Sequence, residues 1–249
     1  MTTIVAVSPH PDDAVLSIGG VLHDLAKRHT VEIVTVFASD APPQVSHLAA
    51  RLAGLSGANI GAARRAEDRR AVESLGARKH HLMFCDAVHR RAAPDQWLIQ
   101  EEADLYRTAP EAELVAKVSE TLTRRLAEAC PVLVLGPAGH GDHIDHVATA
   151  AALATSCAGT ACATWSDMPY GGSSAFRDRC TPLHLSPTAW SAKVAAIACY
   201  ETQVRWLFPA VNDVGTAARQ MCGGADWFVT KTDAQRRGLH TLRQLIGEQ

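Results

Sequence analysis

The chain is 249 residues long, and 47% of the residues are hydrophobic, enough for a sizeable buried core. Its 24 lysine and arginine residues are balanced by 26 aspartate and glutamate residues, for a formal net charge of −2. Nucleic-acid-binding domains carry a basic excess or stripe. We therefore expect no nucleic-acid partner, and nothing indicates a polybasic membrane anchor.

The sequence also contains no targeting or spanning signal. No apolar run approaches the roughly 18 residues that a membrane span needs. Met1-Thr2-Thr3 leads directly into a predicted strand, without the basic and apolar regions of a secretory signal. The seven cysteines form no CxxC pair, which favours reduced core thiols over disulfides or Cys-ligated zinc. We expect a cytoplasmic protein without a membrane partner, with a homo-oligomer as one option.

Strands alternate with helices along the first 160 residues. The predicted strands are Thr3–Ser8, Val31–Phe37, His81–Phe84 and Val132–Leu135. The predicted helices are Asp13–Lys27, Val45–Leu52, Ala62–Leu75, Glu111–Cys130 and an alanine-rich helix that ends near Leu153. Beyond residue 160, we expect a strand end at Thr164-Trp165, helices over Thr188–Tyr200 and Ala234–Ile246, and a strand over Asp226–Thr230.

This alternation predicts an α/β fold that is Rossmann-like, with a mostly parallel sheet flanked by helices and a smaller C-terminal extension. No linker separates two units, so we expect a single domain over residues 1–249. Its Rossmann-like core covers about residues 1–160, and about residues 161–249 supply part of a substrate pocket.

Two features near the first strands point to a site. Gly19-Gly20 lies within the first predicted helix, where each glycine costs about 1 kcal/mol relative to alanine. Such glycines indicate the close approach of another backbone or of a ligand. Residues 38–60, with the short helix Val45–Leu52, follow a predicted strand and form a candidate lid.

Ser8-Pro9-His10-Pro11-Asp12-Asp13 connects the first strand to the first helix. Loops at the carboxyl ends of strands are where open α/β sheets bind ligands. A histidine and two carboxylates are more than a turn requires. On its own, the stretch could equally be a helix N-cap, for which aspartate is a favoured residue.

His143 and His146 lie three residues apart at the start of another predicted helix, directly after the strand Val132–Leu135. Side chains at i and i+3 share one face of a helix. Two surface histidines would explain this pair alone. Because both clusters follow predicted strands, we favour a shared metal site, which matches the His and carboxylate ligands of a catalytic zinc.

Together, the two motifs resemble those of the PIG-L/LmbE-like family of zinc-dependent N-acetyl-sugar deacetylases, whose members include enzymes of mycothiol, bacillithiol and antibiotic biosynthesis. Three weaker matches agree in order: Arg65-Ala-Glu-Asp-Arg-Arg up to Leu75-Gly76, Cys85-Asp86, and Lys193 to Tyr200 and Gln203. The resemblance covers about residues 4–205. It implies a hydrolase of a small amino-sugar metabolite, for example in secondary metabolite biosynthesis.

The resemblance also implies roles for individual residues. His10, Asp13 and His146 would hold the metal, which would be Zn²⁺, or Fe²⁺ as the alternative. Asp12 would be the general base. His143 would be protonated and would stabilise the oxyanion or protonate the leaving amine, with Asp145 orienting it. The residues that would touch the sugar hydroxyls are Arg65 and Asp86.

Some positions depart from the family pattern. Ala14 replaces a glutamate that commonly follows the two aspartates, and Gly141 replaces a tyrosine that polarises the substrate carbonyl in some members. We expect His140 or Tyr170 to contact substrate in place of that tyrosine. Asp142 is expected to be the N-cap of the following helix.

Other functions remain open. A metal-dependent amidase acting on a thiol-conjugate or other non-sugar amide would use the same ligands. A non-catalytic Rossmann-like binding protein would keep the fold with a degenerate site. A nucleotide-binding module is weaker, because the first strand is not followed by a glycine-rich phosphate loop.

Overall fold

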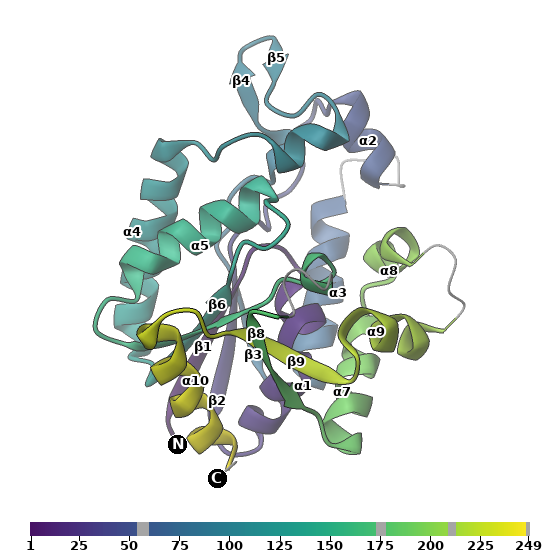
Figure 1. The fold of residues 1–249 in the computed structure, drawn as a ribbon. Helices are drawn as coiled ribbons and strands as arrows, with labels where there is room; N and C mark the ends of the chain where they lie inside the picture. The colour runs from purple at the N-terminus through teal and green to yellow at the C-terminus, as the bar shows by residue number, and fades with distance from the viewer. Residues whose placement is uncertain (54–59, 173–177, 209–212, 248–249) are drawn as a thin grey trace.

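The computed structural model describes residues 1–53, 60–172, 178–208 and 213–247 (Figure 1). Its main sheet has seven strands in the order β3-β2-β1-β6-β7-β9-β8. The first five pair in parallel, and β9 runs antiparallel to both of its neighbours. This architecture confirms the predicted α/β class and its mostly parallel sheet.

The strands of this sheet are β1 (Thr3–Ser8), β2 (Thr30–Thr35), β3 (Arg78–His81), β6 (Leu133–Pro137), β7 (Ala161–Trp165), β8 (Cys180–His184) and β9 (Ala225–Val229). The α-helices are α1 (Asp13–Ala26), α2 (His47–Ala53), α3 (Ile60–Ser74), α4 (Ala112–Ala129), α5 (Ile144–Ser156), α7 (Pro187–Ala198), α8 (Glu201–Leu207), α9 (Val214–Cys222) and α10 (Asp233–Ile246). A hairpin of β4 (Arg91–Ala93) and β5 (Gln96–Trp97) is accompanied by the short 3-10 helices η1 (Ala87–His89), η2 (Glu102–Tyr106) and η3 (Tyr170–Gly172).

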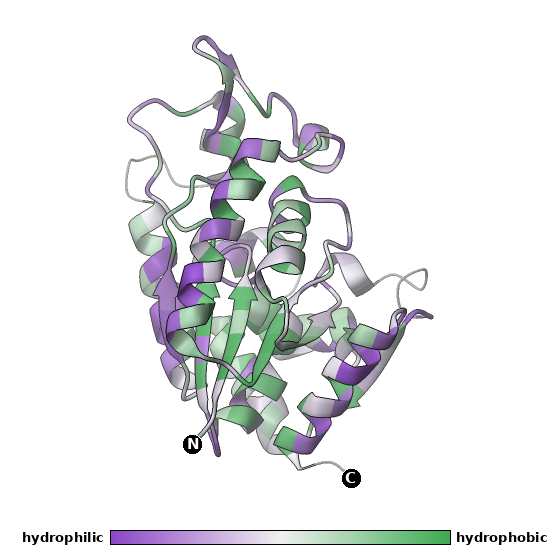
Figure 2. Cartoon of the chain, turned by 90° about the vertical axis from the view of Figure 1, so that its left-hand side faces the viewer, coloured by the Kyte–Doolittle hydropathy of each residue, from purple (hydrophilic) through white to green (hydrophobic). Residues whose placement is uncertain are grey.

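The central strands are apolar on both faces, because helices cover both sides of the sheet. Along β1, Ile4 and Ala6 pack into a cluster with α1, α3, α7 and α10, whereas Val5 and Val7 face a second cluster with α4 and α5. Figure 2 shows the strands as the hydrophobic centre, with polar residues on the outer faces of the helices. No helix in the described ranges is long and apolar enough to cross a membrane.

Most predicted elements are present, but β3 begins earlier than expected. The predicted strand His81–Phe84 is wrong in its bounds, since β3 ends at His81. The chain still runs beside β2, because the N–H of Leu82 donates to Thr35 O at 2.8 Å. Met83 has φ 61°, in the left-handed region that interrupts an extended strand. β8, α8 and α9 were not predicted.

The two glycines of α1 make room for side chains, not for another backbone or a ligand as the sequence had indicated. A Cβ on Gly20 would lie 2.3 Å from Leu185 Cδ1, and one on Gly19 would lie 3.2 Å from Lys193 Cγ. Lys193 is fully buried and its Nζ pairs with Asp226 on β9. Together, these contacts pack α1 against α7 and tie both helices to β9 of the sheet.

The sheet places a ligand site between β1 and β6. From β1 the chain builds outward through β2 to β3, and later from β6 outward through β7. Neighbouring strands whose connections leave in opposite directions open a crevice at their carboxyl ends. The segment between β3 and α4 and the helix α2 extend above this end of the sheet (Figure 1).

Candidate active site

A pocket that is partly open to solvent lies at the carboxyl ends of β1 and β6. Its floor contains both motifs that the sequence singled out. The β1–α1 turn contributes His10, Asp12 and Asp13, and the start of α5 contributes His143 and His146. The two motifs therefore lie together, as the sequence predicted. His10 contacts Asp145, which lies 135 residues further along the chain.

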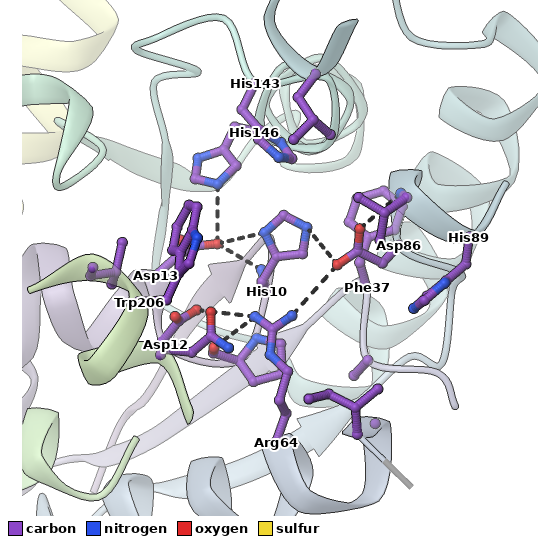
Figure 3. Close-up of a pocket in the computed structure, with 18 of the residues that line it drawn as sticks. His10, Asp12, Asp13, Phe37, Arg64, Asp86, His89, His143, His146 and Trp206 are labelled. Atoms are coloured by element: carbon purple, nitrogen blue, oxygen red, sulfur yellow. Dashed lines mark hydrogen bonds and ion pairs between the residues drawn. The ribbon is translucent and has the colours of Figure 1, made fainter. Parts of the chain in front are cut away.

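His10, Asp13 and His146 each offer one ligand atom, and these atoms all lie within 4.8 Å of one another. Asp13 Oδ2 is 3.2 Å from His10 Nδ1 and 3.2 Å from His146 Nε2 (Figure 3). All three residues are buried. Two imidazole nitrogens and one carboxylate are the ligand types of a catalytic zinc site, so this donor set fits a metal ion.

The outer nitrogen of each of these imidazoles meets a buried carboxylate. His10 Nε2 lies 3.0 Å from Asp145 Oδ2, and His146 Nδ1 lies 2.8 Å from Asp167 Oδ1. Metal-binding histidines usually donate their second N–H to such a partner, which fixes the ring and the tautomer. The arrangement is a further observation that fits a metal between the inner nitrogens.

Asp167 was not identified from the sequence. It follows β7, and the rule that drew attention to Asp13 and Asp86, a carboxylate just after a strand, would also have selected it. The two motifs are conspicuous because they contain histidines. A single aspartate before Met168-Pro169 carries no such signal.

Asp145 contacts different groups from those that the resemblance implied. Its Oδ2 accepts the N–H of Ala87 at 2.9 Å in addition to facing His10, and its Oδ1 accepts from Arg90 Nη1 at 2.6 Å. The contact with His143 runs the other way, since the backbone N–H of Asp145 donates to His143 Nδ1 at 3.3 Å. Arg90 thus supports the floor through Asp145, a contact that the sequence did not reveal.

His143 is neutral in this environment, in contrast to the protonated form that the resemblance implied. Burial, followed by the nearby rings of His146 and His10, lowers the pKa of His143 to about 3. Because Nδ1 accepts the N–H of Asp145, the ring proton resides on Nε2. The ring can therefore donate one hydrogen bond from Nε2.

Asp12 is held beside the cluster of His10, Asp13 and His146 in a strained backbone conformation. Its φ of 120° is in a region that side chains rarely adopt, and such outliers gather at functional sites. Burial, and then the charge of Asp13, raise the pKa of Asp12 to about 8, while Arg64 opposes this rise from 3.7 Å. The carboxylate can therefore take up a proton near neutral pH.

Arg64, not Arg65, enters the pocket. Arg64 Nη1 lies 3.6 Å from Asp86 Oδ2, and its Nη2 lies near Asp12 (Figure 3). Arg65 instead donates to Ala38 O and Asp40 Oδ1, both at 2.8 Å, and does not line the pocket. The structure thus brings Asp86 to the pocket but places Arg65 beside it.

Asp86 belongs to the segment after β3, and its carboxylate lies beside His10 on the pocket floor. Its Oδ2 lies 3.6 Å from His10 Nε2. Burial alone would raise the pKa of Asp86, but His10 and Arg64 outweigh burial and lower it. An ionised carboxylate beside a guanidinium offers both acceptors and donors to a polyhydroxylated ligand.

Tyr170 lines the pocket, whereas His140 does not. The Tyr170 ring centroid lies 5.5 Å from that of His146 and 5.9 Å from that of Tyr106. A Cβ on Gly141 would lie 2.5 Å from Tyr170 Cβ, so Tyr170 fills the space that a larger residue at 141 would need. His140 Nδ1 is instead 2.9 Å from Ser166 Oγ.

Two smaller expectations about the motifs can also be compared with the structure. Asp142 is not the N-cap of α5. It has φ 60°, and the cap is His143, whose Nδ1 accepts the N–H of Asp145. At Ala14, the backbone N–H donates to Ser8 Oγ at 3.0 Å, so the turn is closed by serine.

The pocket rim consists of apolar groups that the sequence gave no reason to select. They come from the residues after β2, from α3, from η2 and from α8. The largest of them are Phe37, Ile60, Leu105, Tyr106, Trp206 and Leu207. Trp206 is 44% exposed although it lines the pocket, which leaves its ring available to a ligand.

Comparison with known proteins gives a consistent result. The family model described as "PIG-L: GlcNAc-PI de-N-acetylase" matches residues 5–157. The chain is 28% identical over 172 residues to 2'-N-acetylparomamine deacetylase of Streptomyces fradiae, covering 67% of this chain and 57% of that protein. It is 30% identical over 149 residues to 1D-myo-inositol 2-acetamido-2-deoxy-alpha-D-glucopyranoside deacetylase of Corynebacterium glutamicum, covering 58% and 49%. The chain thus spans about half the length of these curated relatives.

Solved structures match over nearly the whole chain. The zinc-inhibited form of teicoplanin deacetylase Orf2 has a TM-score of 0.75 and 28% identity, covering 93% of this chain and 99% of that chain. The A40926 pseudoaglycone deacetylase Dbv21 has a TM-score of 0.71 and 29% identity, with coverage of 92% and 95%. N,N'-diacetylchitobiose deacetylase from Pyrococcus horikoshii, at 15% identity, covers 96% and 85% with a TM-score of 0.57, and shares the fold.

Proposed function

The chain belongs to the PIG-L family, and from this premise we propose that it is a metal-dependent amidohydrolase. It removes an N-acyl group, acetyl in the simplest case, from a small metabolite that contains an amino sugar. The observation that carries the proposal is the convergence of His10, Asp13 and His146 beside a strained Asp12. The proposal treats residues 1–249 as one domain, because residues after 160 supply Tyr170 and Trp206 to the pocket.

His10, Asp13 and His146 would hold the ion. Zinc is the proposed ion, with ferrous iron as the alternative. When bound at such a site, zinc polarises a carbonyl and lowers the pKa of its water ligand to about 7. Asp145 and Asp167 keep the two imidazoles oriented toward the ligand position.

The remaining floor residues handle protons and charge. Asp12 accepts the proton of the attacking water on its carboxylate, and Arg64 favours its ionised form by charge. His143 donates from Nε2 to the amide oxygen as negative charge develops there. After the C–N bond breaks, the proton held by Asp12 passes to the amine that leaves.

The polar part of the pocket suits the sugar and the apolar rim suits what is attached to it. Arg64 and Asp86 offer donors and acceptors to hydroxyl groups, and the resemblance assigns Arg65 the same role from just outside the pocket. Tyr170 lines the wall near His146, while His140 would act on substrate only through the β6–α5 loop in which it lies.

The names of the relatives support amino-sugar substrates. They name acetylated aminoglycoside, glycopeptide and inositol-linked glucosamine compounds. These names favour a secondary or thiol metabolite over a non-sugar amide. We also propose that the protein is cytoplasmic and that its partner is a small molecule, with neither nucleic acid nor membrane as a partner. A homo-oligomer is the open option.

Asp12→Asn tests the catalytic role. We expect turnover of N-acetylglucosaminides, followed as released primary amine, to fall about 10²–10⁴-fold, since general base catalysis contributes that much. Metal content should stay at the wild-type value. Asp24→Asn, a carboxylate on the same helix that pairs with Lys27, should leave both unchanged. Wild-type turnover in Asp12→Asn would contradict the mechanism.

Metal analysis of purified protein tests the ligand set. Wild type should contain one metal ion, whereas His146→Ala should contain little. Equal trace metal in the two proteins would show that the cluster does not bind an ion.

A further inference from the structure

Asp167 lies behind the pocket floor, where it contacts His146 and the loop between β6 and α5. It follows β7, the strand next to β6, and it is almost completely buried. The N–H of the next residue, Met168, donates to Ser17 Oγ on α1 at 3.1 Å, which fixes the position of the chain at this strand end.

One oxygen of Asp167 determines which nitrogen of His146 is free. A neutral imidazole has one N–H and one lone pair. Because Nδ1 lies 2.8 Å from Asp167 Oδ1, the N–H resides on Nδ1 and is donated to the carboxylate. In the metal-free protein Nε2 faces Asp13 Oδ2, 3.2 Å away, as an ion pair. When a metal displaces the proton of Nε2, the lone pair is therefore released on the side where the other ligand atoms converge.

The second oxygen of Asp167 holds the loop between β6 and α5. It accepts the backbone N–H groups of Ala138 at 2.9 Å and His140 at 3.0 Å. This loop contains Gly139 with φ 75° and Gly141 with φ 87°, so its course requires turns that a chain of ordinary residues would resist. The loop leads directly into His143 and His146.

We propose that Asp167 is a positioning residue for the metal centre, which holds His146 in the ligating tautomer and fixes the loop that carries both α5 histidines. It is the counterpart of Asp145, which meets the outer nitrogen of His10. The inference rests on the proposed function only in taking His146 as a metal ligand.

Asp167→Asn tests the inference without any substrate. An amide places an NH₂ group either against the loop N–H groups or against His146 Nδ1, so one of the two contacts is lost. We expect the dissociation constant of the metal-free protein for Zn²⁺, measured by competition with a chromophoric chelator, to rise about 10–100-fold. The visible spectrum of the Co²⁺-loaded variant should also change.

Ser166→Ala is the matched control. Ser166 is the preceding residue, is equally buried, and its Oγ contacts His140 Nδ1, not a proposed ligand. This variant should bind Zn²⁺ with the wild-type constant. Circular dichroism shows whether Asp167→Asn is folded. If the folded variant binds Zn²⁺ with the wild-type dissociation constant, the inference is overturned.

If Asp167→Asn does not fold, nitrogen-15 NMR spectra of the histidines in the Zn²⁺-loaded wild type test the inference instead, because they show which ring nitrogen of His146 carries the proton. We expect His146 to carry its proton on Nδ1, and a proton on Nε2 would overturn the inference. The two ideas can also fail separately. If Asp167→Asn binds Zn²⁺ more weakly than wild type, and the zinc-loaded wild type hydrolyses no N-acetyl sugar, the inference is supported and the proposed function is contradicted.

Discussion

Arg64 and Arg65 are neighbours in the sequence, yet their guanidinium groups have different surroundings. Successive residues on an α-helix point about 100° apart, since 3.6 residues make one turn. The face of α3 that carries Arg64 turns toward Asp12 and Asp86, and Arg65 turns toward Asp40. A linear motif match identifies the helix, but it cannot tell which of two adjacent arginines faces the pocket.

Arg64→Gln should lower kcat/KM by about 10–100-fold, because charged hydrogen bonds contribute about 1.5–3 kcal/mol. It should also move the acidic limb of the pH profile to higher pH. The charge of Arg64 lowers the pKa of Asp12, so its removal lets that pKa rise and a higher pH is needed to ionise the base.

Arg65→Gln is the comparison for that experiment. Its partners are Asp40 and Ala38 O, outside the pocket. The pH profile should keep its wild-type position. A larger effect at Arg65 than at Arg64 would restore the role that the resemblance implied for Arg65.

At the same scale, the sequence predicted the positions of His10, Asp13 and His146 because local spacing and strand ends are visible in the sequence. It did not identify Asp167 or Arg90, although the strand-end rule could have selected Asp167. Their contacts with His146 and Asp145 depend on how β7 and the segment after β3 lie beside the floor, which no local pattern encodes.

At the scale of elements, buried strands and long amphipathic helices were predictable. β1 was predicted with its exact bounds because a run of apolar residues ends at Ser8-Pro9. The unpredicted β8 contains Pro182 and lies at an edge of the sheet, where proline is tolerated. α8 and α9 are short, and their boundaries depend on packing more than on periodicity.

The contact between α10 and β7 gives a test at this scale. A Cβ on Gly238 would lie 1.9 Å from Cys162 O and 2.8 Å from Ala163 N, which are backbone atoms that cannot rotate away. Gly238→Ala should therefore destabilise the protein by about 1–3 kcal/mol or more. Chemical denaturation measures this change.

Arg237→Ala provides the matched control on the same helix. Arg237 is exposed, and surface substitutions usually change stability by less than about 0.5 kcal/mol. Equal stability of the two variants would mean that α10 shifts on β7 without cost.

The pocket rim is also a property of elements. Its apolar groups come from the residues after β2 and from α3, η2 and α8, which are far apart in sequence. In the sequence, each of these apolar residues looks like an ordinary core residue. Only the fold shows that together they surround the mouth of one pocket. Residues 54–59, within the segment expected to form a lid, lie outside the described residues.

For the whole molecule, ionisation of the site links stability to pH. Burial lowers the pKa of His10, but Asp86, Asp13 and Asp145 outweigh burial and raise it from 6.5 to about 10. The carboxylates around His146 also raise its pKa. The stabilisation of the metal-free protein by these charged rings is complete below pH 6.5 and is lost as pH rises toward 10.

Zinc binding should therefore matter more at high pH. The ion displaces protons from both rings, so its affinity rises with pH, and tighter binding stabilises the folded state. We expect the difference in Tm between zinc-loaded and metal-free protein to widen from pH 7 to pH 9. Scanning calorimetry measures both forms.

His146→Ala should show no such widening, because it lacks one of the ligands. A difference in Tm that stays constant from pH 7 to pH 9 in the wild type would show that proton release from the rings does not accompany binding.

The crevice between β1 and β6 has a consequence for how the protein is made. His10 and Asp145 are separated by 135 residues, and a ribosome adds about 5–20 residues per second, so roughly 7–27 s pass between their appearances. During that interval the nascent chain carries His10, Asp12 and Asp13 without the histidines of α5. An ion captured then would meet only two of its three proposed ligands, His10 and Asp13. Under the proposed function, complete coordination therefore requires α5, so full metal binding would follow translation of that helix.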